Sequence, residues 1–162
     1  MPDRVLIADS GPLLGLALVD GVDFLQRLYK AVLVPQAVVD EITSQGEYRP
    51  ASDLFERSNW IHIFKVKLPE PELMPVFLGR GEVEVIRLGI EHADSLLLID
   101  DYRARRTAEA LGLQCIGAAG VLVRAKKMGL VALVRPLLLT MRQKGYYISE
   151  SIVQAACRHA NE

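Results

Sequence analysis

The sequence predicts an α/β protein that folds as a three-layer sandwich, with a central, mainly parallel sheet and extra helices at its C-terminal end. Short, continuously apolar runs such as VLIA, AVLV and SLLLI alternate with segments of helical periodicity, which is typical of a parallel sheet covered by helices. Strands buried on both faces are apolar throughout instead of alternating. The length of 162 residues suits one domain of roughly 100–200 residues.

Five short segments are the predicted strands, at 5–8, 31–34, 60–66, 96–99 and 113–116. Four of them are followed by Asp, Pro or Gly, which are common turn residues. The segments with helical periodicity are 13–29, 36–44, 50–59, 79–93, 102–111 and 118–127. The first of these contains Asp20-Gly21, where we expect a break. The stretch LPEPELMP at 68–75 has three prolines and is predicted to be a loop.

The C-terminal part of the chain, residues 131–162, lacks a further strand. Segments 136–144 and 149–159 have helical patterns, and Ser149 is the expected N-cap of the second. We expect these two helices to form an extension of a single domain that covers 1–162, packed on the domain itself or on a dimer partner.

The composition is that of a globular protein, with 51% hydrophobic and 24% charged residues. No run approaches the roughly 20 apolar residues of a membrane span, and the N-terminus lacks the cleavage site of a signal peptide. We therefore expect a cytoplasmic protein, with Cys115 and Cys157 reduced. The net charge of −1 argues against tight non-specific binding of nucleic acid. It does not exclude a nuclease, because a cluster of active-site acids cancels basic residues in the sum.

Aspartates follow two of the predicted strands. Asp9 ends the first strand, and Asp100 and Asp101 end the run SLLLI. Ligands of open parallel sheets bind outside the carboxyl ends of the strands, and carboxylates gathered there need a compensating positive charge. Oxygen ligands favour Mg²⁺ or Mn²⁺. The alternative for each Asp is that it starts a turn or caps the next helix.

Two glutamates border apolar helix faces. Glu41 neighbours Val38 and Ile42 at helical spacing, whereas Asp40 is expected to face outward. Glu82 shares its face with apolar and small residues (Val85, Ile86, Gly89 and Ala93). Glu84 shares a more polar face with Arg87, Leu88 and Glu91, so we expect it in a solvated pair with Arg87. The alternative for Glu82 is an acid that stabilises the helix N-terminus.

These residues carry a resemblance to a known family. The segments IADSGPLLGLA, VPQAVVDEI, GRGEVEVIRLGIE, LLLIDDYRARRTAEALGL and IGAAGVLVRAKKMGLV resemble the PIN-domain superfamily, the nuclease fold of the VapC-type toxins. Within it the chain is most similar to a compact prokaryotic branch catalogued as a domain of unknown function. The resemblance covers roughly residues 4–150 and implies a PIN-like sandwich.

The resemblance also implies roles for individual residues. Asp9, Glu41, Glu82 and Asp100 match the family's catalytic acids, and Asp9, Glu82, Asp100 and Asp101 would hold one or two divalent ions, Mg²⁺ or Mn²⁺. Ser10 matches the small hydroxyl residue after the first aspartate. The third acid is Glu82 where Asp is more common, which changes its reach toward a metal.

The implied activity is metal-assisted hydrolysis of RNA, with Ser10, Arg103 and Arg105 contacting the substrate. Arg106 is expected on a solvated helix face. The family further implies a VapC-like toxin with a small antitoxin partner, and the apolar tail and helix 13–29 suggest a homodimer.

Two other functions compete with this interpretation. A catalytically inactive PIN-like module would bind nucleic acid or protein with the same fold. A phosphatase with an aspartyl nucleophile would need a second Asp two residues after the first, where this chain has Gly11. The three histidines have no metal-ligand spacing, and the segment Gly79-Arg80-Gly81 lacks the Lys-Ser/Thr of a phosphate-binding loop.

Overall fold

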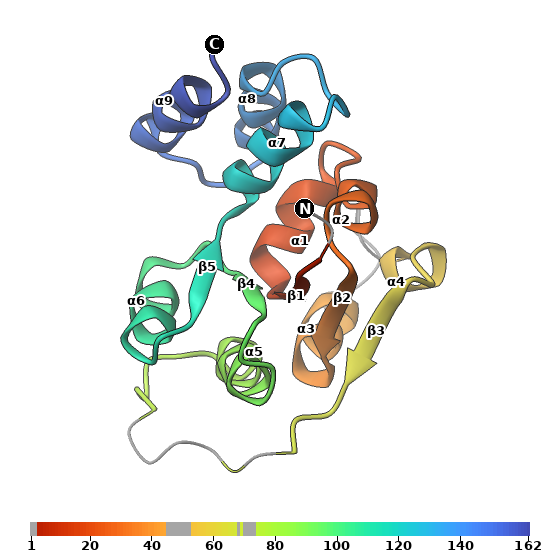
Figure 1. The fold of residues 1–162 in the computed structure, drawn as a ribbon, viewed down its shortest axis with the longest axis vertical. Helices are drawn as coiled ribbons and strands as arrows, with labels where there is room; N and C mark the ends of the chain where they lie inside the picture. Colours follow the sequence, from red (N-terminus) through yellow and green to blue (C-terminus); the bar gives the residue numbers. More distant parts are fainter. Residues whose placement is uncertain (1–2, 45–52, 68, 70–73) are drawn as a thin grey trace.

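The sheet is five-stranded and all of its strand pairs are parallel (Figure 1). The structure is a computed structural model that describes residues 3–44, 53–67, 69 and 74–162. The strands are β1 (Val5–Ala8), β2 (Ala31–Pro35), β3 (Ile61–Phe64), β4 (Leu96–Leu98) and β5 (Gln114–Ile116), in the order β3-β2-β1-β4-β5. The strand order reverses between β1 and β4, which is where open parallel sheets bind ligands.

The helices connect and cover these strands, so the predicted fold class is confirmed. Before β4 they are α1 (Ser10–Ala17), α2 (Asp23–Leu28), α3 (Gln36–Ser44), α4 (Leu54–Arg57) and α5 (Arg80–Glu91). After β4 they are α6 (Tyr102–Ala110), α7 (Ala118–Lys127), α8 (Arg135–Gln143) and α9 (Glu150–His159). Among the described residues, no helix is long and apolar enough to cross a membrane.

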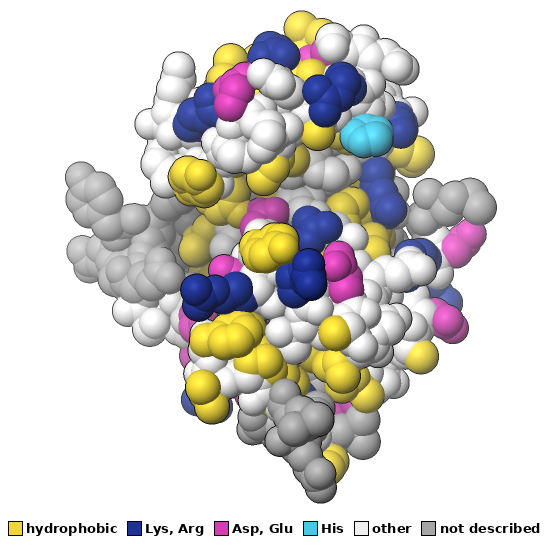
Figure 2. Space-filling view, turned by 90° about the vertical axis from the view of Figure 1, so that its left-hand side faces the viewer, with side chains coloured by type: hydrophobic (Ala, Val, Ile, Leu, Met, Phe, Trp, Pro, Cys, Tyr) yellow, Lys and Arg dark blue, Asp and Glu magenta, His cyan; other side chains and the backbone are white. Residues whose placement is uncertain are grey.

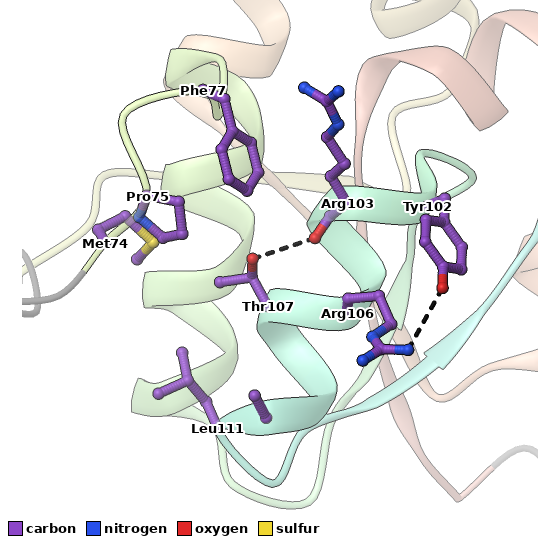
Figure 3. Close-up of a pocket in the computed structure, with 9 residues that line it drawn as sticks. Met74, Pro75, Phe77, Tyr102, Arg103, Arg106, Thr107 and Leu111 are labelled. Carbon is purple, nitrogen blue, oxygen red and sulfur yellow. Dashed lines mark hydrogen bonds between the residues drawn. The ribbon is translucent and has the colours of Figure 1, made fainter.

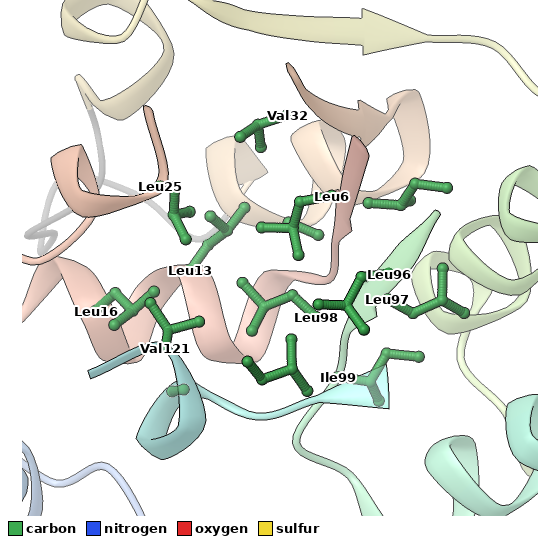
Figure 4. Packing of buried hydrophobic residues seen from close by; sticks show 14 of the residues in the cluster. Leu6, Leu13, Leu16, Leu25, Val32, Leu96, Leu97, Leu98, Ile99 and Val121 are labelled. Carbon is green, nitrogen blue, oxygen red and sulfur yellow. The ribbon is translucent and has the colours of Figure 1, made fainter. Parts of the chain in front are cut away.

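The hydrophobic core lies on both sides of the central strands. Figure 4 shows Leu98 of β4 pointing toward Leu13 of α1, while Leu97 points the other way. Leu97 packs against Gly89 of α5, so closely that a Cβ there would meet its side chain at 2.8 Å. All three leucines are fully buried. Because successive side chains of a strand point to opposite faces, this double burial explains why the strands are apolar throughout.

The C-terminal helices pack on the same chain. Helix α9 contacts α7 and α8, and the pair α8–α9 lies at the end of the molecule opposite α5 and α6 (Figure 1). The Glu162 carboxylate accepts hydrogen bonds from the backbone N–H groups of Val134 (2.5 Å) and Arg135 (3.0 Å) and from Lys126 Nζ (2.9 Å). Ser149 caps α9 by accepting from the N–H of Ile152, as the sequence predicts.

Several predicted boundaries differ from the structure, most of all those of two predicted helices. The helix expected at 13–29 is two helices, α1 and α2, and α1 already begins at Ser10 because Pro12 fits within its first turn. The helix expected at 50–59 is reduced to α4, although residues 50–52 lie outside the described residues. Most of the loop expected at 68–75 also lies outside them.

Candidate active site

Asp9 and Asp100 meet at the carboxyl edge of the sheet because β1 and β4 are neighbours. Ala8 pairs with Leu98, and the Asp9 N–H donates to the Leu98 carbonyl at 3.0 Å. Asp9 is also the N-cap of α1, but its side chain makes no capping hydrogen bond. The chain therefore turns from strand to helix at Asp9 and leaves its carboxylate available at this edge.

The Asp9 carboxyl is buried among other acids. The residue is only 6% exposed, and within the described part of the chain its Oδ1 is buried without a hydrogen-bond partner. Burial raises the pKa of Asp9 to about 7, and the negative charges of Glu82, Glu41 and Asp100 add to this effect. A buried, unpaired carboxylate is costly, and a bound cation would relieve that cost.

Glu41 reaches the same site from α3. Its Oε2 accepts from Ser10 Oγ and its Oε1 accepts from the Gly81 N–H, both at 2.9 Å. A Cβ at position 81 would lie 2.6 Å from Oε1, closer than real Cβ contacts allow. A larger residue at position 81 would therefore displace the Glu41 carboxylate. Ser10 holds this glutamate instead of standing free for a substrate.

Glu82 lies in the first turn of α5, where its Oε2 accepts from the Gly79 N–H at 3.3 Å. Partial burial raises the pKa of Glu82, and the charges of Asp101 and Glu41 act in the same direction. The bond to Gly79 is the helix-start role that the sequence left open as an alternative. Its position among the other acids leaves a metal-binding role open as well.

Asp100 is fixed by both of its oxygens. Oδ1 accepts from the Ala118 N–H at 3.0 Å, at the start of α7, and Oδ2 accepts a short hydrogen bond from the Tyr146 hydroxyl. A Cβ at Gly117 would overlap Oδ1. Burial raises the pKa of Asp100, while the bonds from Tyr146 and Ala118 and the charge of Arg105 oppose this rise.

Asp101 has a structural role at the start of α6. Its Oδ1 accepts from the Ala104 N–H at 2.9 Å and so caps the helix. This was the alternative for every strand-end aspartate. Its charge still contributes to the acidic edge, because it raises the pKa of Glu82.

The acids lie together at the carboxyl edge of the sheet, but their side chains are not arranged as a complete set of metal ligands. Among the described residues, no group of three or more Asp, Glu, His or Cys side chains could hold a metal ion. Glu41, Glu82 and Asp100 instead take hydrogen bonds from protein donors. The donor set still fits a hard divalent cation, since it consists of carboxylate oxygens and includes the unpartnered Oδ1 of Asp9.

The three arginines of α6 lie in different surroundings. Arg105 is beside Asp100, where it lowers the pKa of that carboxyl, and it borders Gly117. Arg103 stacks over the Phe77 ring, and Arg106 lies over the Tyr102 ring. Arg106 is exposed on its helix face, as the sequence predicts, and its neighbour Tyr102 is exposed as well.

Glu84 corrects another expectation. Its side chain is only 16% exposed, and its Oε2 accepts from the Ala37 N–H at 3.0 Å in the first turn of α3. Its Oε1 lies 3.8 Å from Nε of Arg80. Leu88, assigned to the same polar face, is fully buried. The face assignment was wrong because α5 packs against α3 as well as against the sheet.

Tyr146 is the contributor that sequence reasoning missed. It lies between α8 and α9, 46 residues after Asp100, and its ring packs against Gly15 of α1. Burial and the negative charge of Asp100 raise its pKa. Nothing in the local stretch GYYIS distinguishes Tyr146 from Tyr147, which is 87% exposed.

Comparisons with known proteins identify the family and the fold. A family model described as PIN domain matches residues 5–162. The fold is similar to that of a PilT N-terminus domain protein from the archaeon Sulfolobus solfataricus P2, with 16% identity and a TM-score of 0.59 over 75% of this chain and 93% of that chain. A domain of a functionally unknown protein from Methanocaldococcus jannaschii is 17% identical, with a TM-score of 0.47 over 71% of this chain and 91% of that one. No curated protein matches.

Proposed function

The chain belongs to a PIN-domain family, whose members are generally nucleases, and we propose that it is a divalent-metal-dependent ribonuclease. The observation that supports this most is the Asp9 carboxylate. It is buried, its Oδ1 has no partner among the described residues, and three further acids raise its pKa. Such an arrangement is unfavourable for the fold by itself and is typical of a site that binds a cation.

In this proposal Asp9, Asp100 and Glu82 hold Mg²⁺ or Mn²⁺, with Asp101 adding negative charge. When bound, the cation lowers the pKa of an attacking water and offsets charge on the leaving oxygen. In the same proposal Glu41, which Ser10 and Gly81 hold, would orient the attacking water and accept its proton.

Arg105 is the residue we propose to contact the scissile phosphate. A cleft of about 470 Å³ connects Asp100 and Arg105 with basic side chains of α7 and α9, among them Arg124, Lys127 and His159. A polyanion lying in this cleft would meet basic side chains on its way to the acids, which is the charge pattern that phosphate groups need. Figure 2 shows basic side chains around a hollow on this side of the molecule.

The matched pair Glu41→Gln and Asp40→Asn tests this function. Both residues belong to α3, but Asp40 is exposed and pairs with Gln36. With a fluorescent single-stranded RNA at saturating Mn²⁺, Glu41→Gln should lose most of the cleavage rate, about 100-fold or more. Asp40→Asn should cleave like the wild type. Equal rates for all three proteins would contradict the proposed role of Glu41.

A catalytically inactive binding module is the second candidate, favoured by the absence of a preformed metal cluster among the described residues. It predicts that Mn²⁺ neither supports cleavage nor raises the melting temperature. A ligand that binds only the folded state must raise that temperature. A metal-dependent rise that Asp9→Asn abolishes would therefore exclude this candidate.

The proposal extends to a cytoplasmic, VapC-like toxin that forms a homodimer and is neutralised by a small antitoxin. It predicts growth arrest on expression of the wild type but not of Asp9→Asn. It also predicts a dimer mass by light scattering.

A further inference from the structure

A second hollow lies along the outer side of α6, next to the acids. Its volume is about 630 Å³. The residues that line it are Met74, Pro75, Phe77, Tyr102, Arg103, Arg106, Thr107, Ala110 and Leu111. We call it the α6 groove. Figure 3 shows the segment that carries Met74, Pro75 and Phe77 beside α6. The other lining residues belong to α6, except Leu111, which directly follows it.

The α6 groove exposes large apolar side chains. Tyr102 is 70% exposed, Phe77 53% and Leu111 47%. Single exposed apolar residues are ordinary, but a hollow that gathers several of them marks a binding surface. Figure 2, which views the side of the molecule where α6 lies, shows hydrophobic side chains beside basic ones.

The same groove carries unpaired positive charge. The Arg103 guanidinium lies 5.4 Å from the centre of the Phe77 ring, and that of Arg106 lies 5.8 Å from the centre of the Tyr102 ring. Within the described part of the chain neither arginine forms an ion pair, and no acid lines the groove. Flat aromatic rings, each with an arginine over it, suit a ligand that combines planar groups with negative charge.

The position of the α6 groove next to the acids favours a polymer with unpaired bases over a duplex as its ligand. Asp100, Asp101, Tyr102 and Arg103 are consecutive, so the groove begins where the acidic edge ends. Tyr102 and Arg103 belong to the first turn of α6, which Asp101 caps, so a polymer that runs from Asp100 along α6 meets these two residues first. Duplex bases are stacked on one another and cannot reach such rings, whereas unpaired bases stack readily on aromatic side chains.

We propose that the α6 groove binds unpaired bases of single-stranded RNA next to the scissile phosphate. Phe77 and Tyr102 provide the stacking surfaces, and Arg103 and Arg106 contact the neighbouring phosphates. This inference rests on the proposed ribonuclease function for the identity of the polymer. It adds that the enzyme distinguishes single strands from duplexes by stacking.

Binding without cleavage tests the groove independently of the chemistry. The full-length Asp100→Asn protein, without divalent metal, is titrated into a fluorescein-labelled single-stranded RNA, and anisotropy reports Kd. Adding Phe77→Ala or Tyr102→Ala should raise Kd about tenfold, because one stacked base is lost. Tyr102→Phe keeps the ring and should stay within about twofold. Ile63→Ala, a 48% exposed residue of β3, is the matched control and should not change Kd.

Two further RNAs complete the test. The Asp100→Asn parent should bind an oligonucleotide with abasic positions about tenfold more weakly than the intact single strand. For this abasic RNA, adding Tyr102→Ala should leave Kd unchanged. A duplex of the same sequence should bind less tightly than the single strand. Equal Kd values for intact and abasic RNA, or for single strand and duplex, would overturn the inference.

Cleavage of the single strand by the wild type in Mn²⁺ is measured separately. Base-dependent binding without cleavage would leave the groove assignment standing and refute the nuclease. Cleavage with Kd unchanged in Phe77→Ala and Tyr102→Ala would refute the groove alone. A groove that binds a protein helix instead would show neither base dependence nor an effect of these variants on RNA binding, and it too refutes the inference.

Discussion

The Tyr146 hydroxyl donates a hydrogen bond to Oδ2 of Asp100. A side chain from between the two C-terminal helices thus reaches an acid that follows a central strand. Its ring is held by α1, where a Cβ at Gly15 would lie 2.8 Å from it. The C-terminal extension is therefore part of the acidic edge and not only a cover for the core.

Removal of this hydroxyl should strengthen metal binding, because it competes with a cation for the same carboxylate oxygen. In Tyr146→Phe we expect the half-saturating Mn²⁺ concentration, read from the metal-dependent rise in melting temperature, to fall about tenfold. Tyr147→Phe, at the exposed neighbouring tyrosine, should match the wild type. If Tyr146→Phe needs more Mn²⁺, the hydroxyl supports the metal site instead of competing with it.

Gly15→Ala should destabilise the fold by forcing Tyr146 away. The new methyl group would lie within 3.0 Å of the Tyr146 ring and the Met141 side chain, and such overpacking costs about 1–3 kcal/mol. Thermal unfolding measures the change in stability. Gly11→Ala is the control in the same helix, because a Cβ there meets nothing within 4 Å and alanine favours a helix. Equal melting temperatures for the two variants would contradict the close packing.

The Asp9 carboxyl predicts a pH dependence of stability without metal. Its pKa is raised from 3.8 to about 7, so the folded state holds this proton more tightly than the unfolded state. The protonated carboxyl therefore contributes its full stabilisation below about pH 4, and this stabilisation is lost as pH rises through about 7. Between the unfolded and folded pKa values, the free energy of unfolding falls by about 1.4 kcal/mol for each pH unit. Chemical denaturation of wild type and Asp9→Asn across this window should show the variant gaining relative stability toward pH 7. If the difference in the free energy of unfolding between the two proteins stays constant across this window, the pKa of Asp9 is the same in the folded and unfolded states.

Glu162 predicts the opposite sign. Burial by itself would raise its pKa, but the N–H groups of Val134 and Arg135 together with Lys126 outweigh it and lower the pKa. The stabilisation is therefore present above the unfolded pKa, near 4.5, and is lost as pH falls through the folded value. Glu162→Ala should lower the melting temperature at pH 7 and match the wild type at about pH 3. The exposed Glu109→Ala is the control and should show no such difference.

Local patterns account for most of the fold. Segments 36–44 and 118–127 form helices with the predicted ends, because Pro35 or Gly117 precedes each one and the apolar residues repeat at helical spacing. The acids after β1 and β4 could be placed at one edge because both follow strands whose apolar runs predict a parallel sheet. Tyr146 could not be predicted at Asp100, since this contact depends on how α8 and α9 pack. Glu84 was misplaced for the same kind of reason, because its partner Ala37 belongs to another helix.

Gly81 and Gly117 limit which sequence changes this protein can accept. Each glycine lies against one carboxylate, Gly81 against Glu41 and Gly117 against Asp100. Even alanine at either position would push an acid away from the edge of the sheet while leaving every acid in the sequence. A search for inactive variants of this chain that looks only for missing acids would therefore overlook the changes at these two glycines.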